Sequence, residues 1–334
     1  MSLTRRSFVS ATIGTLTVFS RSLRAADFSL TQYHNQTPAS SLHVRLVQMW
    51  AAIEGESRGR IAATVFAQNN NILGSDPAAL KALVAGDIQF FTLMGGILGT
   101  IMPVAEVQQV PFAFRSAAHA HQAMDGPLGA YLVEEMAAKG IHGFRVGAFD
   151  NGMREITSNK RIATPADLAG LKMRVPAGQL VADTFKAFGC EPVTLNSDSI
   201  YAALKDGRAD AQENPLTLAD QFKLYEVVKD VAMTDHMWSG FNLLAHLPTW
   251  QRLPADLQAI VDRNVAKHVK LQRQDQIAAN TRLRAELATR GLEFNTPDAA
   301  PLKKQLAGVY ATWKEKLGSK CWKLLEESTG FRTL

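Results

Sequence analysis

The sequence predicts an α/β protein of two domains, with mainly parallel sheets and one long helix near the C-terminus. Short apolar runs alternate with helical patterns between residues 28 and 213, a rhythm that is typical of β-α-β units. Residues 255–290 contain neither Gly nor Pro, which favours a single long helix. The chain has 334 residues, enough for two domains of roughly 100–200 residues each.

Residues 1–26 are interpreted as an export signal that lies outside the fold. Arg5 and Arg6 form a twin-arginine pair, a mildly apolar stretch follows at 9–19, and Ala25 and Ala26 offer a small-residue cleavage site. A general secretory signal with two adjacent arginines is the alternative. Either signal predicts a periplasmic protein that is cleaved near Ala25 or Ala26.

The export signal also carries most of the excess positive charge. The whole chain has a formal net charge of +5. Removing residues 1–26 lowers Lys plus Arg from 36 to 32 against 31 Asp plus Glu, which leaves +1. This balance gives no support for a nucleic-acid partner. Glycines and a proline interrupt the next most apolar run, residues 90–105, so we expect a buried strand and loop there.

In the first half of the chain, the spacing of apolar residues distinguishes strands from helices. Alternate apolar residues predict a strand at 28–33, followed by a loop at 34–39. Apolar residues three or four apart predict a helix at 42–56. The other expected elements are strands at 60–66 and 88–93 and helices at 76–85 and 117–136, the last broken near Gly126 and Pro127.

The middle of the chain repeats this alternation, and one helix start is marked by its cap. Thr164, Pro165 and Asp167 have the spacing of an N-cap, a first-turn proline and a capping acid, and Gly170 marks the end of that short helix. The other expected elements are strands at 143–149, 154–158, 172–175, 193–195 and 209–213 and helices at 180–188 and 199–205.

The long segment 255–290 would extend about 54 Å if it were wholly helical. Because this exceeds the width of a small domain, the helix could lie across both domains. Its periodicity weakens at 273–276, which leaves room for a bend or a break. No flexible linker is evident, so we expect the chain to cross between the domains several times.

Two arginines and an asparagine stand on three predicted strands. Arg174 lies on the strand at 172–175, at the edge where open α/β sheets bind ligands. Its planar guanidinium suits a bidentate contact with a carboxylate. Arg154 begins another strand, and Asn214 ends a third. Together they predict a receptor for a small organic acid.

Each of these residues also has a simpler interpretation. Arg174 could form a surface salt bridge, Arg154 could pair with Asp150 or Glu155, and Asn214 could be an ordinary turn residue before a proline. The local sequence leaves these alternatives open.

Other residues are weaker candidates for the same site. Asn35 and residues 69–71 follow predicted strands and either solvate loops or donate hydrogen bonds to a ligand. Met94 and Trp238 would give the cleft apolar walls, although Trp238 could instead pack in the core. Apolar walls make aromatic or branched acids as plausible as dicarboxylates.

Motifs of enzymes and cofactor sites are absent from the sequence. It contains no zinc-protease, nucleophile-elbow or phosphate-loop pattern, so we expect a receptor without a cofactor or metal rather than an enzyme. An exported hydrolase is the remote alternative. The two cysteines, Cys190 and Cys321, are expected as buried thiols, with a disulfide between them as the alternative.

Several linked stretches resemble the solute-binding subunits of tripartite ATP-independent periplasmic (TRAP) transporters, of the dicarboxylate-binding type. These stretches are residues 164–176, 201–207, 210–215 and 225–227. The resemblance implies a periplasmic-binding-protein-like fold, in which two α/β lobes enclose a ligand cleft and a long helix spans both. It also implies that Arg174 holds the solute carboxylate, with Arg154 and Asn214 beside it in the cleft.

The same resemblance implies the organisation and partners of the chain. Lobe I would comprise residues 27–151 and 240–279, and lobe II residues 152–239 and 280–334. The receptor, by default a monomer, would deliver its solute to the TRAP permease subunits in the membrane. A binding protein of an ABC importer or of a sensor is the alternative. Met94 stands where relatives that bind sialic acid have an acidic residue, so we do not expect sialic acid.

Overall fold

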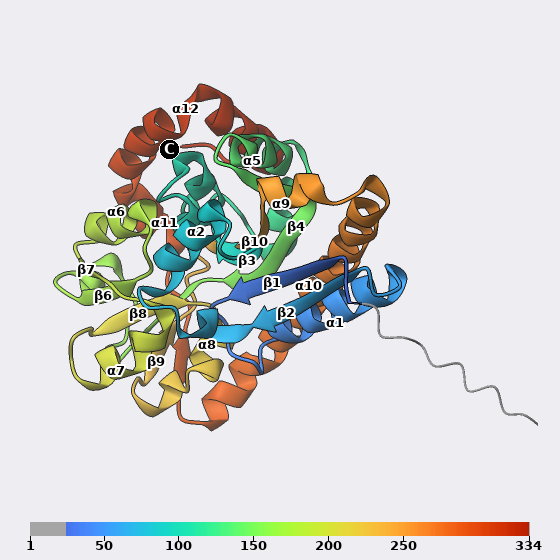
Figure 1. Cartoon of the computed structure of the whole chain (residues 1–334). Coiled ribbons are helices and arrows are strands. Elements are labelled where there is room, and N and C mark those ends of the chain that lie inside the picture. Colours follow the sequence, from blue (N-terminus) through green and yellow to red (C-terminus); the bar gives the residue numbers. More distant parts are fainter. Residues whose placement is uncertain (1–24, 334) are drawn as a thin grey trace, which may run out of the picture.

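The computed structural model describes residues 25–333, which form two β-sheets covered by helices (Figure 1). The twin-arginine pattern and the apolar stretch of the expected export signal lie outside the described residues. Within residues 25–333, no helix is both long enough and apolar enough to span a membrane.

The first sheet has five strands in the order β2-β1-β3-β10-β4. These strands are β1 (Phe28–His34), β2 (Ile61–Phe66), β3 (Phe90–Met94), β4 (Ile141–Met153) and β10 (Trp238–His246). The helical segments of this half are α1 (Ser41–Glu56), η1 (Ala67–Asn71), α2 (Ser75–Ala85), α3 (Gly95–Leu98), η2 (Pro103–Gln109), α4 (Ala117–Asp125), α5 (Pro127–Ala137) and α9 (Leu247–Arg252).

The second sheet has six strands in the order β11-β9-β5-β8-β6-β7. These strands are β5 (Glu155–Ser158), β6 (Lys172–Val175), β7 (Glu191–Thr194), β8 (Ala211–Asn214), β9 (Asp230–Ala232) and β11 (Glu293–Asn295). The short helical segments of this half are η3 (Pro165–Leu168), α6 (Gln179–Ala187), η4 (Ser197–Ser199), α7 (Ile200–Lys205), α8 (Leu216–Gln221) and η5 (Leu224–Glu226).

Both sheets are mainly parallel, as expected, but each contains one strand that runs in the opposite direction. In the first sheet, β10 is antiparallel to β3 and β4. In the second, β5 is antiparallel to β8 and β9. A parallel connection needs a crossover, usually a helix. Strand β5 instead follows β4 of the first sheet after a single residue, and β10 follows β9 of the second sheet without a helix between them. Neither strand is preceded by a crossover helix, and each runs opposite to the other strands of its own sheet.

Helix α10 (Ala255–Thr289) is one helix of 35 residues that contacts α1 and β4 on one side of the molecule and α8 on the other. It therefore spans both halves, as expected, and shows no break at 273–276. The weak periodicity there has a physical cause, because buried polar side chains bond to the end of β4. The side-chain amide of Gln272 donates a hydrogen bond to the carbonyl of Asp150 and accepts one from the N–H of Asp150. The side chain of Gln276 donates to the carbonyl of Asn151.

The C-terminal helix α12 (Ala307–Thr329), preceded by α11 (Ala299–Gln305), packs on elements of both halves. It contacts α4, α5 and η2 and also α6. The exact lobe boundaries stay a prediction. Cys190 and Cys321 are both buried free thiols, as expected. The capping arrangement at Thr164 and Asp167 is present, although it opens a 3₁₀ turn rather than an α-helix.

Candidate functional site

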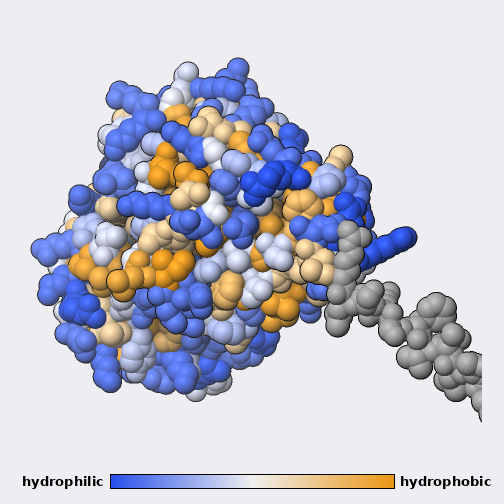
Figure 2. Space-filling view, viewed as in Figure 1, coloured by the Kyte–Doolittle hydropathy of each residue, from blue (hydrophilic) through white to orange (hydrophobic). Residues whose placement is uncertain are grey.

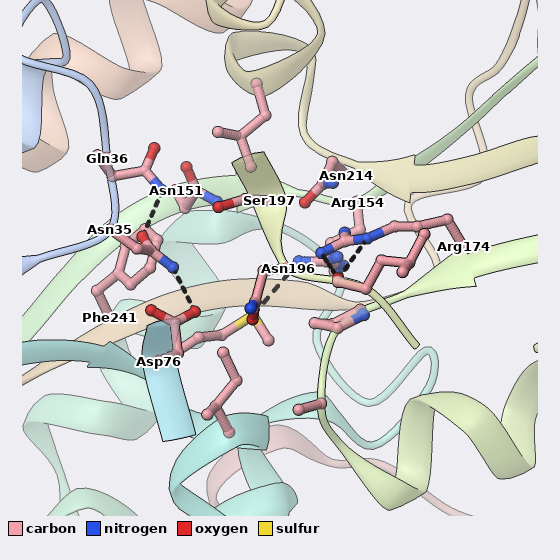
Figure 3. A pocket seen from close by; sticks show the side chains of 16 residues that line it. Asn35, Gln36, Asp76, Asn151, Arg154, Arg174, Asn196, Ser197, Asn214 and Phe241 are labelled. Carbon is pink, nitrogen blue, oxygen red and sulfur yellow. Dashed lines mark hydrogen bonds between the residues drawn. The ribbon is translucent and has the colours of Figure 1, made fainter. Parts of the chain in front are cut away.

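A polar cavity lies where residues of both sheets meet. Its empty volume is about 390 Å³ including the open mouth, within the range of small-molecule sites. Figure 3 shows the side chains that surround it. Its lining residues are Asn35, Gln36, Asp76, Met94, Ile97, Asn151, Arg154, Arg174, Pro176, Ala177, Leu195, Asn196, Ser197, Asn214, Leu218 and Phe241. Five of the six residues predicted from the sequence are therefore brought together.

Arg174 on β6 is a buried cation without a direct ion pair. Its Nε and Nη2 donate to the carbonyl of Leu195, at 2.9 and 2.6 Å. No carboxylate in residues 25–333 lies within ion-pair distance of it. Burial is the main cause that lowers the pKa of Arg174 to about 10; the charge of Arg154 acts in the same direction and that of Glu213 in the opposite direction. An anion entering the cavity would compensate this buried charge.

Arg154, between β4 and β5, already has its counter-ion. Its Nε and Nη2 donate to both carboxylate oxygens of Glu213 on β8, and Nη2 also donates to the Glu213 carbonyl at 2.7 Å. Its Nη1 donates to Ser239 Oγ at 3.0 Å. The partner is thus neither Asp150 nor Glu155, the two partners considered from the sequence. Arg154 lines the cavity with most of its donors occupied.

Asn214 and Met94 complete the wall around the two arginines. Asn214, the last residue of β8, donates to Gln212 Oε1 at 2.6 Å, which orients its amide. Met94, at the end of β3, places its Sδ 3.4 Å from Arg154 Nη1. The thioether of Met94 therefore contacts the guanidinium of Arg154.

Trp238 does not line the cavity, although the sequence made it a candidate for the wall of the cleft. Its indole is fully buried at the start of β10. The ring Nε1 donates to Asp150 Oδ1 at 2.8 Å, and the ring packs edge-on against Phe114 and His121. Trp238 fixes the end of β4 from behind the site, in agreement with the core interpretation.

Asp76 is a cavity residue that sequence reasoning missed. It lies in the first turn of α2, where its Oδ2 accepts from Asn35 Nδ2 at 2.8 Å and its Oδ1 from Asn69 Nδ2 at 2.6 Å. Burial raises the pKa of Asp76, and the two amide hydrogen bonds and Arg174 offset part of that rise. No local motif marks this aspartate, since its role in the cavity depends on Arg174, which is distant in sequence.

A second hollow adjoins the first. It has about 800 Å³ of empty space, open solvent included, and shares Asn35, Asn196 and Ser197 with the first cavity. Its wall includes the turn η1, where Asn69 and its neighbours have left-handed φ angles near 50°, a conformation that asparagine tolerates. Asn69 is buried and bonded to Asp76, so this residue is not a simple solvated loop residue.

Comparisons with known proteins agree on one family. The family model described as bacterial extracellular solute-binding protein, family 7, matches residues 33–316. The sialic acid-binding periplasmic protein of Vibrio cholerae is 28% identical over 287 residues, covering 85% of this chain and 88% of that protein. An uncharacterized protein of Sinorhizobium fredii is 33% identical over 77% of this chain, which spans about half (48%) of that protein's length.

Solved structures show the same fold. A TRAP periplasmic solute-binding protein of Roseobacter denitrificans, with bound L-galactonate, has a TM-score of 0.83 and 26% identity and covers 90% of this chain and 99% of its own. A second, from Sulfitobacter with bound β-D-galacturonate, has a TM-score of 0.85 and 23% identity and covers 91% of this chain and 100% of its own.

Proposed function

The chain belongs to family 7 of the bacterial extracellular solute-binding proteins, and we propose that Arg174 in its cleft holds the carboxylate of a small organic acid. Its relatives are solute-binding components of TRAP transporters, and this chain is one of that kind. The relatives from Vibrio and Roseobacter are described with sialic acid and with L-galactonate. Both solutes carry a carboxylate, which supports the chemical class.

The state of Arg174 is the observation that carries this proposal. Its guanidinium is buried, bonds only to a backbone carbonyl and has no ion-pair partner in residues 25–333. Arg154 in the same cavity has a bidentate partner in Glu213. A solute carboxylate would therefore meet one cation whose charge is uncompensated and a second that contributes without losing its own partner.

The proposal includes the route of the solute and of the protein. The chain would be exported and cleaved near Ala25 or Ala26, act as a monomer, and deliver the acid to the permease subunits of a TRAP transporter. On the face shown in Figure 2, hydrophilic residues predominate and apolar residues form separate patches, which supports a monomer. The family match supports this route over an ABC importer or a sensor. We propose that no catalysis occurs in the cleft.

Binding of organic acids to residues 27–334 tests the proposal. A thermal-shift screen with a carboxylate library identifies an acid, because a ligand at 100 times its Kd adds about 2.7 kcal/mol of stability. Titration calorimetry then gives its affinity. Arg174→Ala should weaken binding by about 2 kcal/mol or more, since it leaves the carboxylate buried and unpaired. Arg174→Lys should give an intermediate loss, because lysine keeps the charge but not the planar fork.

Arg115→Ala is the matched control. Arg115 is an exposed arginine that is not part of the cavity wall, so its loss should leave the affinity unchanged. Near-normal affinity in Arg174→Ala would disprove the assignment of the carboxylate to Arg174. No response to any acid in the library would count against the receptor function itself.

A further inference from the structure

The solute cavity is enclosed by walls from both halves of the molecule. Met94 and Ile97 belong to the half built on the first sheet, whereas Arg174, Pro176 and Ala177 belong to the half built on the second. Arg174 is only 3% exposed. A solute can therefore reach its guanidinium only after the two walls separate, and it is retained only while they stay together.

The two walls meet at a seam beside the cavity, where α6 of the second half lies against α3 and η2 of the first. Pro176 and Ala177, which line the cavity, lead directly into the N-terminus of α6. A Cβ at Gly178, the N-cap of α6, would lie 3.4 Å from the carbonyl oxygen of Gly96. The two backbones are thus in close contact, and any movement that opens the cavity at this seam must separate α6 from η2.

The carboxylate of Glu106 on η2 joins the two sides of this seam. Its Oε1 lies 3.3 Å from the N–H nitrogen of Gln179, and its Oε2 lies 2.6 Å from that of Leu180, the first two residues of α6. Gly178 has no side chain that could accept these N–H groups. Glu106 is 3% exposed, so water has little access to the contact. Helix α6 therefore receives its cap from the opposite half of the molecule.

We propose that Glu106 is a positioning residue that holds the solute cavity closed by capping a helix of the opposite half. Separating the walls leaves Glu106 without its partners and the first N–H groups of α6 without their cap, so the contact favours the closed state. It acts on the solute through Arg174, because only the short segment 176–178 separates the strand of Arg174 from α6. The inference rests on the proposed function for its solute, whereas closure can be measured without one.

The burial of Glu106 also makes closure depend on pH. In the closed state, burial raises the pKa of Glu106 to about 7, although its hydrogen bonds from two backbone N–H groups act in the opposite direction. The charged groups that face it are Asp183 on α6, which raises this pKa, and Lys316 on α12, which lowers it. When the seam opens, water reaches the carboxylate and its pKa returns towards 4.5. The closed state therefore binds more protons between these values, and affinity should fall as the pH rises through them.

Distances between labels on the two halves test closure directly. Lys81→Cys on α2 and Lys205→Cys on α7 place one exposed thiol on each half, while Cys190 and Cys321 are buried and do not compete for the label. Pulsed electron paramagnetic resonance of the spin-labelled protein gives the populations of the open and closed forms without any solute. We expect the wild type to populate the short distance of the closed form and Glu106→Ala to shift the population towards a longer one.

Gly178→Ser separates closure from the stability of α6. In the Glu106→Ala background, a serine at the N-cap supplies an acceptor from the same half as the helix, so it should restore stability in urea but not the short distance. With an acid identified by the library screen, Glu106→Ala should weaken binding about tenfold, a difference of about 1.4 kcal/mol. Gly178→Ser should not recover this loss.

Ser116→Ala is the matched control for the loss of a cap. Ser116 accepts the N–H of His119 and caps α4, and both residues belong to one half. Its loss should lower the stability of the protein in urea and leave the label distances and the affinity unchanged.

Glu106→Gln tests the dependence on pH, because glutamine keeps an acceptor and cannot ionise. Titration calorimetry with the same acid from pH 4.5 to pH 7 should show the wild type losing affinity relative to Glu106→Gln, by about tenfold or more across the range. Every other titrating group is the same in the two proteins, so their difference isolates Glu106.

Each outcome supports or overturns the inference. If Glu106→Ala keeps the label distances and the affinity of the wild type, or if Gly178→Ser restores both, Glu106 is only a helix cap and the inference is wrong. A wild type that never populates the short distance, or pH profiles that coincide for wild type and Glu106→Gln, would also overturn it. If no acid binds, the proposed function fails, while the label distances still decide whether Glu106 holds the cavity closed.

Discussion

Two arginines occupy one cavity, yet their electrostatic states differ. Arg154 and Glu213 form a buried pair, 1% and 0% exposed, and His236 lies 3.3 Å from the same carboxylate. Arg174 has only a carbonyl partner. The pair is therefore part of the structure that positions the cavity wall, whereas Arg174 has an unoccupied capacity for an anion.

This difference predicts the cost of breaking the buried pair. Glu213→Gln leaves Arg154 as an uncompensated buried charge and should lower the free energy of unfolding by about 3–5 kcal/mol. The double variant Arg154→Met with Glu213→Leu removes both charges and should lose much less than the single variants Arg154→Met and Glu213→Leu combined. Urea unfolding of the wild type, these two single variants and the double variant measures this coupling. Additive losses would show that the pair is not energetically coupled.

Sequence reasoning identified the residues of the site better than their partners. Arg174 could be predicted because strand alternation and its position at a strand end are local features. Glu213 and Asp76 could not, because their roles depend on Arg154 and Arg174, which are distant in sequence and meet them only after folding. Trp238 was misplaced because an aromatic residue on a strand has the same local pattern at a cavity wall and in a core.

At the scale of elements, helix α6 receives its N-terminal cap from a distant segment. Its N-cap, Gly178, has no side chain to accept the first N–H groups. The carboxylate of Glu106 on η2 does so instead, at 3.3 Å from the N–H of Gln179 and 2.6 Å from that of Leu180. This contact joins η2 to the helix that follows the strand of Arg174, so it helps to position the cavity wall.

The cap predicts a pH-dependent difference in stability. Burial raises the pKa of Glu106 to about 7, even though the hydrogen bonds from the two backbone N–H groups act in the opposite direction. Because this pKa is raised relative to the unfolded value near 4.5, the folded state binds more protons between these values, and the contribution of Glu106 to stability falls as the pH rises through this window.

Variants of Glu106 separate its charge from its role as an acceptor. Glu106→Gln keeps the acceptor and cannot ionise, so its stability relative to the wild type should rise from pH 4.5 to pH 7. Glu106→Ala also loses the acceptor, so it should be about 1 kcal/mol or more less stable than Glu106→Gln at every pH in that range. Thermal and urea unfolding across the range measure both. A difference between Glu106→Gln and wild type that does not vary with pH would contradict this account.

The elements themselves follow from local sequence more closely than the sheets do. The expected helix at 180–188 appears as α6 (Gln179–Ala187), and the expected strand at 172–175 appears unchanged as β6. The antiparallel directions of β5 and β10 were missed, because strand direction depends on how the chain passes between the sheets. The cap from Glu106 was missed for a related reason, since it lies far from α6 in the sequence.

At the scale of the whole molecule, the chain leaves the first sheet at a backbone position that requires glycine. Gly152, near the end of β4, has a φ of +103°. A Cβ there would lie 2.8 Å from Asn280 Nδ2 of α10 and 3.2 Å from Pro215 Cβ beside β8. The long helix, the first sheet and the second sheet therefore meet at one residue, two positions before Arg154.

This junction predicts that a change at Gly152 affects both stability and binding. Gly152→Ala should lower the free energy of unfolding by about 1–2 kcal/mol from the left-handed backbone alone, and further because Asn280 and Pro215 must move. Since residues on both sides of this junction line the cavity, displacing them should also weaken binding of the identified acid.

Gly170→Ala separates the two effects. Gly170 also has a positive φ, +74°, but a Cβ there meets no atom within 4 Å. It should show the backbone cost without the loss of affinity. Urea unfolding and titration calorimetry on both variants give the comparison. Equal affinities in the two variants would mean that the cavity tolerates a shift at this junction, and the junction would then not position the walls of the cleft relative to each other.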